Sequence, residues 1–164
     1  FVTYQVPMLR DVTGIGPDRI PVFLAIAGIG TVAGTVLSGR LADWKLMPAL
    51  IGTILVQAVV LAAISFVARD PLLMAVGLFI NGAAFGAFAT PIQARIVAAA
   101  KAAPSLASTL ISTAFNAGIA GGALAGSLLL SAGAGYTILP ALAAGCSLAA
   151  ALVAILSWRL DSRP

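Results

Sequence analysis

The chain has 164 residues, of which 61% are hydrophobic and 9% are charged, and its formal net charge is +4. An ordinary soluble domain is about a quarter charged, so this composition excludes a water-soluble globule and indicates an all-α membrane protein that crosses the bilayer several times. The basic residues are dispersed among short connectors instead of gathering on one face, which argues against a nucleic-acid partner.

The chain begins with a short piece of helix, and five complete spans follow it. Residues 1–9 are interpreted as the exit end of a transmembrane helix whose start is missing, and Pro7 would end or kink that helix. A polar connector with several turn-forming residues follows. Each later apolar stretch is long enough to cross the hydrocarbon of a bilayer as a helix. These spans cover approximately residues 21–41, 48–67, 71–94, 105–130 and 136–158.

Single residues refine the interpretation of three spans. Span 48–67 is mostly Ile, Val, Leu and Ala, with Gln57 as its one strongly polar residue, so we expect it to face lipid. Asp70 followed by Pro71 predicts the N-cap and the first residue of the next helix. Cys146 lies in an apolar run and is interpreted as a small buried residue, not as a reactive thiol.

Three of the five spans carry glycines four residues apart, a spacing that places them on one face of a helix. Such a face lets the backbone of a neighbouring helix approach closely within a membrane. The longest row lies in residues 105–130, where we expect a bulky change such as Gly122→Leu to disrupt the helix bundle. The predicted helix-packing residues are Gly30, Gly34, Gly82, Gly86, Gly118, Gly122 and Gly126.

Little chemistry is available at membrane depth. No Asp, Glu, Lys or Arg lies in the middle of a span, so the chain shows no coupling site for protons or ions. It also contains no histidine, and we therefore expect neither an enzyme nor a metal site nor a cofactor.

Polar and aromatic side chains beside the glycine rows form a candidate cavity lining. The asparagines of this lining have an alternative role, a hydrogen bond between two helices instead of contact with a substrate. The alternative role of the phenylalanines is packing between helices instead of stacking on a ligand. The lining consists of Asn81, Phe85, Ser112, Phe115 and Asn116.

The basic residues predict the orientation of the spans. Connectors on one side hold three Lys or Arg residues, and connectors on the other side, which includes the C-terminus, hold six. By the positive-inside rule the second side is cytoplasmic. We therefore expect a multi-pass protein of the inner (plasma) membrane with a cytoplasmic C-terminus.

Two motifs resemble the major facilitator superfamily of transporters. Residues 39–45, G-R-L-A-D-W-K, resemble the G-x-L-A-D-R/K motif of a cytoplasmic loop in that family, and the matching residues are Gly39, Leu41, Ala42 and Asp43. The loop-motif residues taken from this resemblance are Gly39, Arg40 and Asp43. Residues 115–126, F-N-A-G-I-A-G-G-A-L-A-G, resemble the penultimate helix of the drug:proton antiporter-1 exporters. The arabinose, chloramphenicol and purine-nucleoside efflux proteins are the most similar branch.

The resemblance implies the C-terminal half of a 12-helix bundle, comprising the end of helix 7 and helices 8 to 12. It implies export of a small organic molecule, of the drug, sugar or nucleoside class, by alternating access and in exchange for protons. The partners would be the lipid bilayer, the missing N-terminal half of the transporter, the substrate and protons. Two alternatives stay open: a non-transporting membrane subunit that packs through its glycine faces, and an importer of the same fold.

Overall fold

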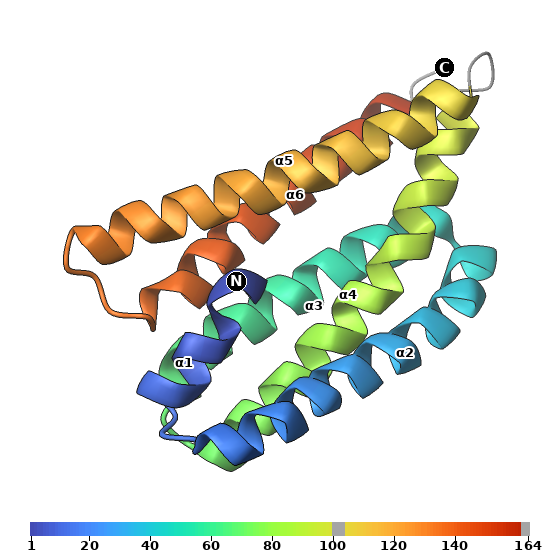
Figure 1. The fold of residues 1–164 in the computed structure, drawn as a ribbon. Helices are drawn as coiled ribbons and strands as arrows, with labels where there is room; N and C mark the ends of the chain where they lie inside the picture. Colours follow the sequence, from blue (N-terminus) through green and yellow to red (C-terminus); the bar gives the residue numbers. More distant parts are fainter. Residues whose placement is uncertain (100–103, 162–164) are drawn as a thin grey trace.

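The chain is helical along nearly all of its described length (Figure 1). The computed structural model describes residues 1–99 and 104–161, and it describes their side chains except at 41–44, 90, 97–99, 104, 105, 107, 108 and 161. Within these residues there is no β-strand. The elements are η1 (Val2–Tyr4), α1 (Gln5–Asp11), η2 (Pro17–Arg19), α2 (Ile20–Trp44), α3 (Leu46–Val67), α4 (Pro71–Ala99), α5 (Pro104–Ser131) and α6 (Ile138–Asp161).

Five of these helices, α2 to α6, are long and apolar enough to cross a membrane. This confirms the predicted all-α class with five complete spans. Two helices run further than expected, because α2 ends at Trp44 instead of near residue 41 and α4 ends at Ala99 instead of near residue 94. Neither extension contains a glycine or a proline, so nothing in the backbone stops the helix there.

The N-terminal segment corrects the prediction for Pro7. The 3₁₀ turn η1 passes directly into α1, and Pro7 is the third residue of α1. A proline is tolerated at this position because the first turn of a helix has no intrahelical partner for its N–H groups. The helix therefore neither ends at Pro7 nor stops at residue 9, but continues to Asp11.

The span at residues 48–67, expected to face lipid, is partly buried within the chain. In an 18-residue apolar stretch of α3, 44% is buried inside the protein, the largest share among the five long helices. The corresponding share in α5 is 6%. The helix packs against both α4 and α6. A helix that is apolar all round suits a protein interior as well as a membrane, so composition alone could not separate the two environments.

The larger apolar cluster lies where α1, α3 and α4 meet. It contains Met8 of α1, Ile64 of α3 and Leu78 of α4, and all three side chains are fully buried. The segment after α1 is tied to the same place, because Thr13 Oγ1 donates a hydrogen bond to the carbonyl of Ala68 over 2.7 Å. This cluster fixes the short N-terminal helix against the end of α3.

Asp70 caps the next helix, as the sequence predicts. Its Oδ1 accepts hydrogen bonds from the backbone N–H groups of Leu72 and Leu73, at 2.8 and 2.9 Å. Pro71 is the first residue of α4. The cap and the proline together define where the helix starts.

The helix α5 is the least supported of the long helices. In Figure 1, α5 runs along the upper edge of the view, away from α2. The main contacts of α6 are with α3, whereas α5 makes only small contacts with α4 and η1. Several leucines on α5 are exposed, and so large an apolar surface is typical of contact with lipid or with a protein partner.

Candidate functional site

The site is built beside the contact between α2 and α4, where two helix backbones touch. A Cβ added at Gly30 or Gly34 would overlap backbone atoms of α4, those of Ala83 in the case of Gly34. In the same way, a Cβ added at Gly82 or Gly86 would overlap carbonyl oxygens of α2. Each row of glycines thus lies against the backbone of the other helix, and the pair forms a closely fitted wall.

A cavity of about 710 Å³, here called the central cavity, lies beside this wall. It is bounded by the N-terminal segment and by all five long helices. Its volume falls in the range of small-molecule sites, roughly 300–1,000 Å³. The lining residues are Phe1, Val2, Tyr4, Gln5, Ala27, Gly28, Thr31, Gln57, Leu61, Asn81, Gly82, Phe85, Gly118, Gly121, Gly122, Ala125, Gly126, Leu139, Leu142, Ala143, Cys146 and Ser147.

Two amide side chains meet at the wall of the central cavity. Nε2 of Gln57, on α3, donates a hydrogen bond to Oδ1 of Asn81, on α4, over 3.2 Å. Both residues are half-buried. The bond uses one of the two amide hydrogens of Gln57 and leaves the amide group of Asn81 free to donate, so the pair retains hydrogen-bonding capacity toward the cavity.

Two further polar groups of the lining are hydroxyls. Thr31 Oγ1 donates to the carbonyl of Ala27 over 3.1 Å, and Ser147 Oγ donates to the carbonyl of Ala143 over 3.0 Å. With their hydrogens used, the two hydroxyl oxygens retain lone pairs that can accept a hydrogen bond. The lining contains no acidic or basic side chain among the described residues. It can therefore hold an uncharged group by hydrogen bonds within apolar walls.

A single tyrosine ties the N-terminal segment to α5. The hydroxyl of Tyr4 donates a hydrogen bond to the carbonyl of Ala123 over 2.7 Å. The ring of Tyr4 lies against Gly126, where a Cβ would overlap it. Both contacts hold the same stretch of a helix that has little other support.

A second cavity of about 620 Å³, here called the side cavity, lies along α5. Phe115 lines it and packs edge-on against Phe88, with ring centroids 6.4 Å apart and an interplanar angle of 62°. Gly118 and Gly122 line both cavities. A Cβ at either glycine would meet nothing within 4 Å, so in the described chain these two face open space instead of a helix. The expected disruption by Gly122→Leu therefore has no structural basis within this chain.

The candidate lining residues do not converge on one site. Asn81 and Phe85 line the central cavity, and Phe115 lines the side cavity. Ser112 and Asn116 are exposed and belong to neither lining. Consecutive residues of a helix point about 100° apart, which separates Asn116 from its neighbour Phe115.

The motif expected in a cytoplasmic loop lies inside a helix. Gly39 and Arg40 belong to the last turns of α2, and the backbone of Asp43 is also helical, while its side chain lies outside the described ones. The connector that separates α2 from α3 is Lys45 alone. The loop assignment is therefore corrected to a helix end.

Sequence reasoning missed several lining residues. Gln57 was assigned to a lipid-facing span, although a lone amide in an apolar helix is expected to seek a partner on another helix. No motif or spacing in the sequence marks Tyr4 or Ser147 as a lining residue, because only the packing of the helices brings them to the cavity. Cys146 is exposed and lines the central cavity, which corrects its interpretation as a buried residue.

Comparison with known proteins finds relatives along almost the whole chain. Over 157 residues the chain is 36% identical to the inner membrane transport protein YdhP of Escherichia coli, in both strain K12 and O157:H7. Over 160 residues it is 30% identical to the chloramphenicol resistance protein of Streptomyces lividans. Each match covers 96% of this chain, and the chain spans 40% of the length of each relative. No family model and no solved structure matches the chain.

Proposed function

We propose that the chain is the C-terminal half of an exporter of the major facilitator superfamily, a proposal supported by its similarity to an inner membrane transport protein and to a chloramphenicol resistance protein. The exported molecule is small and organic, of the drug, sugar or nucleoside class. The single observation that carries the proposal is the central cavity, which all five long helices bound and which offers hydrogen bonds within apolar walls.

Alternating access suits the uneven packing of the helices. The glycine contact makes α2 and α4 a stiff pair, whereas α5 is held by few contacts. A helix with few contacts can shift against a fixed wall at low energetic cost. We assign the moving part of the cycle within this half to α5 and the fixed wall of the binding site to α2 and α4.

Exchange for protons needs a carboxylate from outside the described spans. The five acidic residues of the chain are Asp11, Asp18, Asp43, Asp70 and Asp161, and none lies in the middle of a span. A proton relay within a membrane usually depends on an ionisable residue at that depth. We therefore place the coupling acid in the other half of the transporter.

The excess of basic residues at the ends of α2, α4 and α6 favours a cytoplasmic C-terminus.

The test is an accumulation assay with the complete reading frame that contains this chain. The protein is expressed in an efflux-deficient bacterium, and the uptake of labelled chloramphenicol, arabinose and a purine nucleoside is compared with that of cells carrying an empty vector. At least one compound should accumulate less, and a protonophore should abolish the difference. Increased accumulation would instead support the importer.

A matched pair of variants connects transport to the cavity. Gln57→Leu removes the amide pair and should change the accumulation of the exported compound at an unchanged membrane level of the protein. Gln93→Leu makes the same chemical change at an exposed position of α4 outside both cavities, and it should leave transport unchanged. Equal accumulation of every compound with and without the protein would refute transport and favour the membrane subunit, a role for which the open glycine face of α5 is suited.

A further inference from the structure

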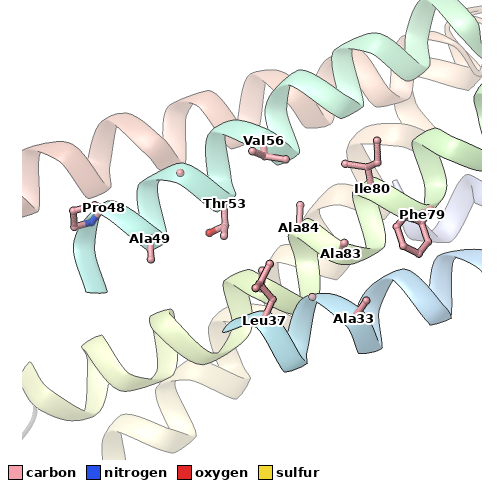
Figure 2. A pocket seen from close by; sticks show the side chains of 13 residues that line it. Ala33, Leu37, Pro48, Ala49, Thr53, Val56, Phe79, Ile80, Ala83 and Ala84 are labelled. Atoms are coloured by element: carbon pink, nitrogen blue, oxygen red, sulfur yellow. The ribbon is translucent and has the colours of Figure 1, made fainter. Parts of the chain in front are cut away.

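An apolar groove on α2, α3 and α4 has no role in the proposed transport. It has a volume of about 560 Å³ (Figure 2). Small side chains form much of its surface, and Figure 2 shows Thr53 as the one labelled residue with a side-chain oxygen. Ala33, Leu37, Pro48, Gly52, Val56 and Ala83 define the groove.

The groove opens on the other side of the α2–α4 contact from the central cavity. On α2, Gly28 lines the cavity and Ala33 lines the groove, and five residues of helix turn the direction by about 140°. On α3 the two sites again use different residues, Gln57 for the cavity and Val56 for the groove. Whatever closes the central cavity therefore does not cover the groove.

Two basic residues stand at one end of the groove. Arg40 follows Ala33 by seven residues, which returns it to nearly the same side of α2 two turns later. Lys45 precedes α3 directly, three residues before Pro48. Arg40 and Lys45 are both exposed, and neither forms an ion pair with a described side chain. Arg40 lies four residues before the end of α2 at Trp44, and basic residues near the ends of membrane helices are suited to contact lipid headgroups.

This arrangement combines an apolar channel with positive charge at its mouth. We propose that the groove holds an acyl chain of an anionic phospholipid whose phosphate pairs with Arg40 and Lys45. From Pro48 to Val56 the wall of the groove extends for about 12 Å, at about 1.5 Å per helical residue. Basic pockets between transmembrane helices are suited to anionic headgroups, and the acyl chain would cover the exposed side chains of Leu37 and Val56.

The test counts phospholipids bound to the purified chain by native mass spectrometry. Phosphatidylglycerol and phosphatidylcholine with identical acyl chains are added separately to the protein in detergent. The chain should retain one phosphatidylglycerol at a concentration well below that needed for phosphatidylcholine. At about 1 kcal/mol for each basic residue, replacing both Arg40 and Lys45 by Gln should weaken phosphatidylglycerol binding about 30-fold.

Filling the groove provides an independent second variant. A Cβ at Gly52 meets nothing within 4 Å, so Gly52→Leu places its side chain in the groove without a backbone clash and should abolish the bound phosphatidylglycerol. Gly145→Leu on α6 and Arg159→Gln are matched controls outside the groove, and both should bind like the unchanged chain.

Three outcomes would overturn the assignment. They are equal binding of the two phospholipids, undiminished phosphatidylglycerol binding after Gly52→Leu, and a dimer that Gly52→Leu dissociates, because a second copy would then occupy the groove. Circular dichroism and size exclusion identify variants that fail to fold. If Gly52→Leu fails to fold, the two Gln replacements decide the question alone. None of these measurements depends on transport.

Discussion

Adding one methyl group between α2 and α4 should destabilise the chain measurably. In Gly34→Ala the new Cβ would lie 2.7 Å from the carbonyl carbon of Ala83 and 2.8 Å from its Cα, whereas ordinary contact begins at about 3.4 Å. The two backbones must therefore separate by more than about 0.7 Å, because the carbonyl oxygen of Ala83 lies closer still and a carbonyl group within a helix cannot rotate away. That separation also disturbs the contacts of Gly30, Gly82 and Gly86 along the same wall.

The expected cost is about 1–3 kcal/mol, the usual range for overpacking a well-filled contact. A loss of 2 kcal/mol changes the ratio of folded to unfolded protein by about 30-fold. Gly28→Ala is the matched control on the same helix, since a Cβ at Gly28 meets nothing within 4 Å and leaves the α2–α4 contact intact. This control should be neutral or slightly stabilising, because alanine is the better helix former.

The assay is unfolding by sodium dodecyl sulfate in mixed micelles, followed by tryptophan fluorescence. The midpoint for Gly34→Ala should fall clearly below that of the unchanged chain, and the midpoint for Gly28→Ala should not. If both alanine variants unfold at the midpoint of the unchanged chain, the close backbone contact is not a source of stability and the stiff wall assigned to α2 and α4 loses its basis.

Three further predictions concern the capping, the support of α5 and the surface charge. Asp70→Ala should cost about 1 kcal/mol of unfolding free energy by removing the N-cap of α4, and an unchanged midpoint would contradict that. Tyr4→Phe should speed amide hydrogen exchange in α5 because it removes the bond to Ala123; unaltered exchange would show that α5 is held in another way. The hydrogen bond from Arg10 lowers the pKa of the Asp11 carboxyl, so the pairing contributes above the unfolded pKa of that carboxyl and is lost as the pH falls through its lower folded pKa. In Arg10→Gln, NMR titration should show the pKa of Asp11 raised, and no change would exclude the pairing.

The amide pair shows what sequence reasoning can and cannot supply for the site. Asn81 was identifiable as a cavity residue because a polar side chain beside a glycine row is conspicuous at membrane depth. Its partner Gln57 was not, since no local pattern states which helix lies beside α4. Ser112 and Asn116 were equally conspicuous on α5, yet the fold leaves both outside the two cavities.

The class, the number of long helices and the N-cap at Asp70 could all be predicted from the amino-acid sequence. These properties are local: bilayer thickness sets the length of an apolar run, unsatisfied backbone groups force it into a helix, and a capping carboxylate acts within one turn. Which glycine rows meet could be seen only in the packed helices. Rows with the same spacing pack backbone to backbone in α2 and α4 but face open space at Gly118 and Gly122. Periodicity defines a smooth face on one helix, whereas a contact needs a second helix whose position depends on the whole chain.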